Sequence, residues 1–404
     1  MTLPRVAITG LGVVSSIGMG WPVFWESLLA GRSGVRKIQY LNTADYPTQF
    51  GGEIRDFDPC AFMPEATARR IGRGTQFAVA ATSMALEDAK LDVRIDGQPR
   101  VGVCLGTTMG DIQALEAIDT IWASSGEREI PSRLFRQYPS CSMSANVAKQ
   151  FGFLGPNLMI PTACAAGNYA LAHAFDLLRL GRADVMVAGG AEPFSRIIFT
   201  GFNRLLAIAP ERCQPFDKQR KGLIAAEGSG MLVLERLDDA RARGATIHAE
   251  MLGYGMSCDG SHMTIPSVDG LTQVLTDALE RTDLDPADVD YISAHGTGTP
   301  ANDRAECAAI RAVFGSHADS VPVSSIKSMI GHTMGAASAL EAIVCALAVR
   351  YDRLPPTMNF EVPDPECDVD CVPNRSRTHP TEIALNNSFA FGGNNACVVF
   401  RKAS

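Results

Sequence analysis

A cysteine stands among small residues in the segment 160–172, which reads IPTACAAGNYALA. The run Ala165–Leu180 has helical spacing, so Cys164 lies at the start of a predicted helix. The positive end of the helix macrodipole favours the thiolate of such a cysteine, and the neighbouring alanines leave room for a substrate. Most free cysteines are inert buried hydrophobes, and this chain has 11. Cys164 is therefore a candidate nucleophile, with a structural role as the alternative.

Two histidines follow strand-like segments beside glycine-rich turns. His295 comes after VDYISA and before Gly-Thr-Gly-Thr, and His332 comes after VPVSSI and a short turn. Catalytic groups gather at such strand ends in α/β folds, although a lone histidine is more often structural. Lys327 lies between apolar neighbours, so it needs a partner if it is buried, and Glu341 on the following predicted helix is a candidate. Otherwise Lys327 extends its amine to solvent from a strand end.

Two further segments fit ordinary turns or a binding site. Thr297 and Thr299 have the spacing of common turn chemistry. Phe391-Gly392-Gly393 fits a hairpin turn. Alternatively, its glycines bring backbone N–H groups close to a reacting carbonyl, as an oxyanion hole requires.

The elements that would position these residues alternate between strand-like and helical runs, which predicts α/β layers. Two pairs of strand-like runs look alike: 185–193 with 230–237, and 384–393 with 396–402. We interpret them as two related halves, residues 1–249 with the cysteine and residues 250–404 with both histidines, sharing one core.

The bulk composition limits the function classes. The chain has 404 residues, is 46% hydrophobic and has a formal net charge of −8, which argues against nucleic-acid binding. The apolar stretch Ala336–Val349 is interrupted by Glu341 and is too short to span a bilayer. The start lacks a signal-peptide pattern, and the cysteines have no CxxC spacing, which argues against a disulfide framework or structural zinc. We predict a cytoplasmic enzyme.

Four segments in a fixed order, TAC, HGTGTP, IKSMIGHTMGAAS and FGGNN, resemble the β-ketoacyl-acyl-carrier-protein synthases of the ketosynthase II type, in the thiolase superfamily. The resemblance runs nearly end to end, from ITGLGVVSSIG through AGGAE and PFD to the terminal FGG segment. It implies a five-layered αβαβα fold of two similar halves. It also implies a decarboxylative Claisen condensation that extends an acyl thioester by two carbons, in fatty-acid or type II polyketide biosynthesis.

The resemblance assigns catalytic roles. Cys164 matches the nucleophile, and His295 and His332 match the two catalytic histidines. Lys327 matches the motif lysine, with Glu341 as its ion-pair partner.

It also assigns binding roles. Thr297 and Thr299 match the threonines that hydrogen-bond the phosphopantetheine arm. The backbone N–H of Phe391, the gating phenylalanine, joins that of Cys164 in the oxyanion hole. The expected acyl tunnel and gate residues are Met109, Phe202 and Phe391.

Partners follow from the same resemblance. We expect no metal and no bound cofactor, because the pantetheine arm arrives on acyl carrier protein. Carrier proteins of this kind are acidic, so a local basic patch is expected, although a plain solvated helix face is the alternative. The candidates are Arg69, Arg70, Arg73 and Arg204. We also expect a homodimer, or a heterodimer with a chain-length-factor-like subunit, with residues 130–146 in the contact.

Several positions depart from the family pattern. The usual RDGF is Arg220-Lys221-Gly222-Leu223 here, followed by Ala226-Glu227-Gly228. Ala390 replaces the glycine on which the phenylalanine gate normally hinges, which predicts a restricted gate. These departures favour a specialised polyketide or polyene pathway over housekeeping fatty-acid synthesis.

Three rival functions remain. A thiolase shares the fold and the cysteine but uses a second cysteine with one histidine. A non-condensing chain-length-factor-like subunit usually lacks the cysteine that is present here as Cys164. A cysteine hydrolase is disfavoured by the two histidines and the absence of a water-activating arrangement.

Overall fold

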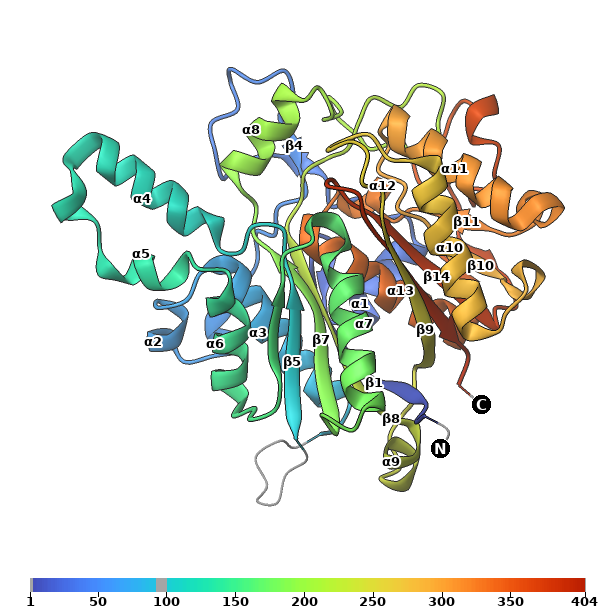
Figure 1. The fold of residues 1–404 in the computed structure, drawn as a ribbon. Helices are drawn as coiled ribbons and strands as arrows, with labels where there is room; N and C mark the ends of the chain where they lie inside the picture. Colours follow the sequence, from blue (N-terminus) through green and yellow to red (C-terminus); the bar gives the residue numbers. More distant parts are fainter. Residues whose placement is uncertain (1–2, 92–99, 404) are drawn as a thin grey trace.

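The computed structural model describes residues 3–91 and 100–403 (Figure 1). The first half contains β1 (Val6–Ser15), β2 (Gly18–Met19), α1 (Trp21–Leu29), β3 (Arg36–Lys37), β4 (Phe50–Gly51), α2 (Glu65–Ala68), α3 (Arg73–Asp88), β5 (Val101–Gly106), α4 (Ile112–Ser125), α5 (Ser132–Gln137), α6 (Cys141–Phe151), β6 (Asn157–Ile160), α7 (Ala166–Arg179), β7 (Val185–Glu192), α8 (Arg196–Arg204), β8 (Gly228–Arg236) and α9 (Leu237–Ala242).

The second half also alternates strands and helices. It contains β9 (Ala249–Cys258), α10 (Val268–Thr282), β10 (Tyr291–Ser293), α11 (Pro300–Phe314), β11 (Val323–Ser324), α12 (Lys327–Ile330), α13 (Ala337–Tyr351), β12 (Arg353–Leu354), β13 (Arg377–Thr378), β14 (Ile383–Phe389) and β15 (Asn394–Arg401). Short 3-10 helices join these elements, and two of them open the central helices: η3 (Ala163–Ala165) before α7 and η6 (Met334–Ala336) before α13.

The strand order of the large sheet is symmetric about its middle. It runs β11-β10-β14-β15-β9-β1-β8-β7-β5-β6. The two sides of the sheet meet where β9 contacts β1. On one side the strands run outward in the order β9, β15, β14, β10 and β11, and on the other side the matching order is β1, β8, β7, β5 and β6. Both outer trios are parallel, and β14–β15 and β7–β8 are both antiparallel. The same five-stranded unit therefore occurs twice, and the similar strand pairs seen in the sequence are β7–β8 and β14–β15.

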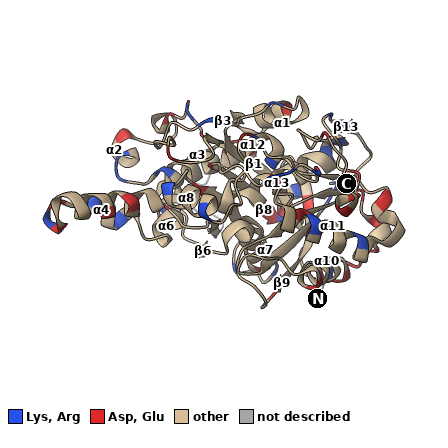
Figure 2. Ribbon diagram, turned by 90° about the horizontal axis from the view of Figure 1, so that it is seen from above, with Lys and Arg blue, Asp and Glu red and all other residues tan. Residues whose placement is uncertain are grey.

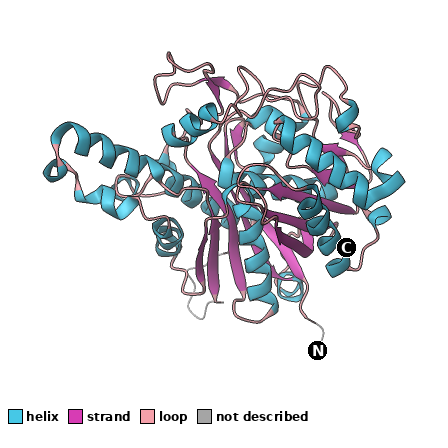
Figure 3. Cartoon of the chain, turned by 45° about the horizontal axis from the view of Figure 1, so that its top comes forward, coloured by secondary structure: helices cyan, strands magenta, loops and turns pink. Residues whose placement is uncertain are grey.

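Helices form three layers around the two five-stranded units (Figures 1 and 3). α7 and α13 contact strands of both units and each other, so they form the central layer. α3 and α6 pack on the outer face of the first unit, and α10 packs on that of the second, with α11 against it. The result is the five-layered αβαβα arrangement that the sequence predicts. The division at residues 249 and 250 into two domains stays a prediction.

Small residues let these layers approach closely. A Cβ on Gly12 of β1 would lie 1.8 Å from the carbonyl oxygen of Ala81 in α3, so only glycine permits this contact. In α13, every residue from Ala337 to Val349 is buried, because strands cover the helix on two sides. The window Met334–Tyr351 is apolar and long enough to cross a membrane, yet 89% of it is buried inside the protein. We therefore assign it as a core helix of the protein. The assignment rests on its burial, because the expectation that this apolar stretch is too short to span a bilayer is wrong.

Candidate active site

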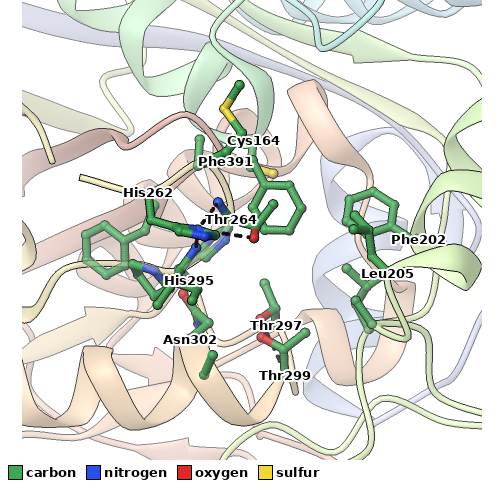
Figure 4. Close-up of a pocket in the computed structure, with 18 of the residues that line it drawn as sticks. Cys164, Phe202, Leu205, His262, Thr264, His295, Thr297, Thr299, Asn302 and Phe391 are labelled. Carbon is green, nitrogen blue, oxygen red and sulfur yellow. Dashed lines mark hydrogen bonds between the residues drawn. The ribbon is translucent and has the colours of Figure 1, made fainter. Parts of the chain in front are cut away.

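Cys164 lies in the turn that joins β6 to α7. The chain passes through Ala163 into η3, and α7 begins at Ala166. Ala163 has a φ of 48°, a left-handed backbone conformation that is uncommon for a residue with a side chain. Cys164 is 6% exposed and lines the cavity drawn in Figure 4. A strained turn thus places a thiol at the start of a helix and at a cavity.

His332 contacts the thiol directly. Its Nε2 lies 3.1 Å from Cys164 Sγ. The backbone N–H of Met334 donates to His332 Nδ1 at 3.2 Å, so Nδ1 is unprotonated. Burial, aided by the charge of Lys327, holds the pKa of His332 well below its usual value, so the ring is neutral. The ring proton is therefore on Nε2, and His332 donates to the sulfur.

His295 also lies close to the thiol. Its ring lies edge-on to that of His332, with centroids 5.5 Å apart and planes at 82°. Cys164 Sγ and one nitrogen from each ring all lie within 4.8 Å of one another. Burial, then the charge of Lys327, then His332 hold the pKa of His295 well below its usual value. Both imidazoles are thus neutral at physiological pH.

Backbone contacts hold His295 in place. Its N–H and that of Gly296 each donate to the buried carboxylate of Glu306 at 2.8 Å. Its carbonyl oxygen accepts from Lys327 Nζ at 2.7 Å. The Lys327 ammonium also forms an ion pair with Glu341, and both side chains are 1% exposed. The structure therefore brings the two predicted partners together beneath His295.

Burial dominates the electrostatics of the charged groups. It raises the pKa of Glu341 to about 7, against the opposing effect of Lys327. It raises the pKa of the Cys164 thiol to about 12, although Lys327 lowers it. Burial of the sulfur therefore opposes the thiolate that the helix N-terminus favours, and the thiolate form of Cys164 stays a prediction.

A cavity of about 330 Å³ connects the thiol to the surface. Figure 4 shows Thr297 and Thr299 on one wall, with their hydroxyls 2.9 Å apart, and Phe202 and Leu205 on another. The rings of Phe202 and Phe391 contact each other, with centroids 5.6 Å apart. The structure thus brings the predicted threonines and both phenylalanines to the same cavity as Cys164.

A loop that sequence reasoning missed forms part of the same wall. His262, Met263, Thr264 and Ile265 line the cavity. The backbone N–H groups of Thr264 and Ile265 each donate to His262 Nδ1 at 3.1 Å, which folds the loop around the ring (Figure 4). Gly392 N–H donates to the carbonyl of Met263 at 2.8 Å. The segment GSHMTIP has ordinary loop composition, and its histidine is the single signal that could have found it.

The Phe391 turn lies beside the nucleophile. Ala390 belongs to one buried apolar cluster with Cys164, Ala165 and Ala396. Among the described residues the N–H of Phe391 has no acceptor, and the N–H of Cys164 lies near its own sulfur. The oxyanion-hole role of these two N–H groups stays a prediction.

Met109 does not line this cavity. It lies in the turn after β5, where its N–H donates to the buried carboxylate of Glu192 at 3.2 Å. Its side chain is 38% exposed. A place in an acyl tunnel would therefore require a surface contact such as a second subunit.

The four arginines proposed for carrier binding do not form one patch. Arg73 donates to the buried carboxylate of Glu227 from two nitrogens, at 2.8 and 2.7 Å. This ion pair turns the Arg73 guanidinium toward the interior of the protein. Arg69 pairs with Glu65 on the exposed α2. Arg204 ends α8, which Figure 1 shows well apart from α2. Figure 2 likewise shows the positions of basic and acidic residues interspersed along the ribbon.

The thiol and two imidazoles are also a ligand set that zinc prefers. For both atoms to bind one ion, the Cys164 thiol would have to lose its proton and the His332 ring proton would have to leave Nε2. The expectation that this site binds no metal stays a prediction.

Known proteins share this fold and these motifs. Residues 4–240 match the model of the β-ketoacyl synthase N-terminal domain, and residues 248–361 match that of the C-terminal domain. The chain is 40% identical to 3-oxoacyl-[acyl-carrier-protein] synthase 2 of Synechocystis sp., with 98% of each protein covered.

Two solved structures are also similar. The ishigamide ketosynthase/chain length factor structure contains a chain with a TM-score of 0.96 and 40% identity, covered fully on both sides. A type II PKS acyl-carrier protein in complex with its ketosynthase bound to the hexaketide gives a TM-score of 0.91 and 34% identity, again with full coverage. The predicted thiolase-like fold and the predicted class, a condensing acyltransferase, are confirmed. The chain belongs to the β-ketoacyl synthase family.

Proposed function

We propose that this chain extends an acyl group held on Cys164 by two carbons, using a malonyl unit delivered on the phosphopantetheine of acyl carrier protein. The observation that carries this proposal is the meeting of one thiol and two neutral imidazoles within 4.8 Å at the inner end of a cavity. The two threonines on the cavity wall suit the amide-bearing pantetheine arm.

The first step transfers the acyl group. Cys164 Sγ attacks the thioester carbonyl, and its proton leaves with the pantetheine thiol. The N–H groups of Cys164 and Phe391 receive the developing oxyanion. Because burial raises the pKa of this thiol to about 12, proton loss accompanies attack rather than preceding it. The N–H of His332 stabilises the negative charge on sulfur as it forms.

The second step forms the carbon–carbon bond. Malonyl thioester loses CO2, and the Nε2–H of His332, with His295 beside it, stabilises the enolate oxygen. The enolate carbon attacks the acyl-cysteine carbonyl, and collapse of the tetrahedral intermediate expels the thiolate of Cys164, which takes up one proton. The products are a β-ketoacyl thioester, CO2 and the free thiol.

Lys327 acts on this chemistry through position and charge. Its ammonium fixes the carbonyl of His295, and its charge adds to the effect of burial in keeping both rings neutral. A neutral imidazole donates one hydrogen bond without carrying a charge that would bind the malonyl carboxylate and oppose its loss. Lys327 is therefore a positioning residue in this proposal.

The mouth of the cavity suggests where the carrier binds. Exposed Arg204 precedes Leu205 and Leu206, which line the mouth. Exposed Lys221 precedes Gly222, whose N–H donates to the carbonyl of Gly298, between the two threonines, at 2.9 Å. We expect these two cations to contact the acidic carrier or its phosphate. The changes Arg204→Glu and Lys221→Glu should raise KM for carrier-bound substrate and spare small thioesters, and an equal effect on both substrates would contradict this contact.

The surface of the first half suggests a dimer. β6 is the last strand of the sheet, and Leu158 on it is 36% exposed. The arm formed by α4 and α5 projects from the body in Figure 1 and exposes Trp122, Phe135 and Tyr138. A strand edge with no partner among the described residues and an arm with exposed aromatic groups both suit a second subunit, which fits the predicted contact in residues 130–146. A homodimer and a heterodimer with a chain-length-factor-like subunit are both compatible with this surface.

The rival functions fit less well. A thiolase needs a second cysteine where this site has two histidines, and a hydrolase needs a protonatable base, whereas His332 donates to the sulfur. A non-condensing subunit has no use for a strained turn that presents a thiol. The likeness to type II PKS structures favours a specialised polyketide pathway over housekeeping fatty-acid synthesis, and we expect the enzyme to act in the cytoplasm.

The test is a condensation assay with acyl-ACP and malonyl-ACP that follows the β-ketoacyl product by mass spectrometry. Wild type should give one CO2 per product, and His332→Ala should still acylate Cys164, at a lower rate, while losing decarboxylation. Product formation by Cys164→Ala would contradict the proposal. Unsaturated or β-keto starters should be preferred, and a preference for saturated long chains would contradict the specialised pathway.

A further inference from the structure

We propose that the hydroxyls of Ser338 and Ser388 act as positioning residues that fix the oxyanion hole by clamping the backbone carbonyl of Cys164. Ser388 Oγ donates to this carbonyl at 3.0 Å, and Ser338 Oγ donates to it at 3.2 Å. Both serines are 0% exposed and come from the second half, whereas the cysteine comes from the first. This inference rests on the proposed acyl transfer to Cys164.

Ser338 replaces a regular helical hydrogen bond. In an α-helix, the N–H of Asn168 would donate to the carbonyl of Cys164, four residues earlier. Here the N–H of Asn168 donates to Ser338 Oγ at 3.0 Å, and the serine hydroxyl passes the hydrogen bond on to the carbonyl. The inserted hydroxyl therefore holds the first turn of α7 open at the nucleophile.

The surrounding residues are shaped for this insertion. A Cβ on Gly167 would lie 2.8 Å from Ser338 Oγ, so a glycine is needed where α7 meets α13. Asn386 Nδ2 donates to the Ser338 carbonyl and to Asn168 Oδ1, at 2.8 Å each. These contacts tie the two central helices together around the inserted hydroxyl.

Ser388 links the two donors of the oxyanion hole. It lies at the end of β14, three residues before Phe391, so its hydrogen bond fixes that strand end relative to Cys164. The neighbouring Ala163 has a φ of 48°, and a conformation of this kind persists where surrounding contacts enforce it. Loss of the clamp lets the turn rewind and moves the Cys164 N–H away from the oxyanion.

The chemistry offers a readout that separates positioning from general structure. Acyl transfer passes through a tetrahedral oxyanion and needs the hole, whereas alkylation by iodoacetamide displaces iodide at sulfur and needs no oxyanion donor. Loss of the clamp should therefore slow acylation of Cys164 and leave its alkylation unchanged.

The experiment compares Ser338→Ala, Ser388→Ala and the double variant in the full-length chain. The matched control is Ser229→Ala, which removes a 0% exposed hydroxyl that donates to a carbonyl elsewhere, that of Gly190, at 2.9 Å. Rapid-quench mass spectrometry measures acylation by octanoyl-N-acetylcysteamine, and a parallel assay measures the iodoacetamide rate. We expect acylation to fall about tenfold in each single variant and about a hundredfold in the double variant. Alkylation should stay within about twofold of wild type in every variant.

Three outcomes are distinguishable. Equal loss of acylation and alkylation, or acylation at the rate of the Ser229→Ala control, overturns the clamp. A wild type that alkylates but is never acylated overturns the proposed function instead. If the double variant does not fold, the acylation rates of Ser388→Ala and Ser388→Thr are compared instead. Threonine keeps the hydroxyl, so Ser388→Thr should acylate faster than Ser388→Ala, and equal rates would overturn the clamp.

Discussion

The turns that open the two central helices have the same backbone but present different groups to the site. η3 leads into α7 with Ala163 at a φ of 48°, and η6 leads into α13 with Met334 at a φ of 49°. In the first turn the next residue is Cys164, whose thiol lines the cavity. In the second it is Gly335, where a Cβ would lie 2.4 Å from the carbonyl carbon of Thr107.

This difference shows how the two similar five-stranded units contribute differently to the site. The first turn carries the nucleophile, and the second turn supports it. Just before the second turn, His332 donates to the sulfur, and just after it, Ser338 holds the cysteine carbonyl. Of two turns with similar backbone, one thus carries the reacting group and the other lies between two of its supports.

The largest expected effect comes from breaking the buried ion pair on the supporting side. Lys327→Met leaves the Glu341 carboxylate buried and unpaired, which should lower the free energy of unfolding by about 3–5 kcal/mol. The pKa of Glu341 is already raised in the fold, and losing Lys327 raises it further. A group with a raised folded pKa stabilises the fold when protonated, so the loss should be smaller at pH 5 than at pH 8.

Urea unfolding at both pH values measures this effect. The double variant Lys327→Met with Glu341→Leu is the control, and it should recover most of the stability without recovering condensation. A double variant as unstable as Lys327→Met would contradict the account of an unpaired buried charge.

A smaller loss should follow from filling the space at the second turn. Gly335→Ala places a methyl group against backbone atoms of residues 107 and 108, which should lower the free energy of unfolding by about 1–3 kcal/mol. Gly201→Ala in α8 is the matched control, since no atom lies within 4 Å of its added Cβ. Urea titration of both variants gives the comparison. Equal free energies of unfolding would contradict the close packing around Gly335.

The reactivity of the first turn should depend steeply on pH. Because burial raises the pKa of the Cys164 thiol to about 12, the thiolate fraction should grow about tenfold per pH unit over the neutral range. The iodoacetamide rate should therefore rise from pH 7 to pH 10 without a plateau. A plateau below pH 8 would mean that a thiolate is already formed in the free enzyme, as the helix-dipole argument predicts.

The smallest effect is expected at the gate. Ala390→Gly removes a methyl group from the cluster around Cys164 and adds backbone freedom, which should lower stability by about 0.5–1 kcal/mol. Loading of long acyl chains should become faster relative to short ones. The ratio of acylation rates with hexadecanoyl and octanoyl carrier thioesters measures this, and an unchanged ratio would show that Ala390 does not restrain Phe391.

Sequence patterns could predict the residues that carry chemistry because each sits in a local motif. Cys164, His295, His332 and Lys327 each follow a strand-like run and precede a distinctive turn, and the structure brings them together. The repeated strand pairs also predicted two similar halves, which the structure shows as two five-stranded units of one sheet, since strand composition is a local property.

What the sequence could not predict depends on long-range packing. The pKa of Cys164 follows from burial beneath a second half that is distant in sequence. The side chain of Arg73 looks like a surface cation until Glu227 is placed beside it. The two serine hydroxyls on the cysteine carbonyl come from positions 174 and 224 residues away. No local pattern marks such contacts.

The central claim is that Cys164 receives an acyl group through its sulfur. Intact-mass spectrometry after mixing the protein with acyl-carrier-protein thioesters of graded length tests this most directly, with Cys164→Ala as the control. The account predicts a mass gain of one acyl group in the wild type and none in the control. An equal gain in the control would place the acyl group elsewhere and contradict the account.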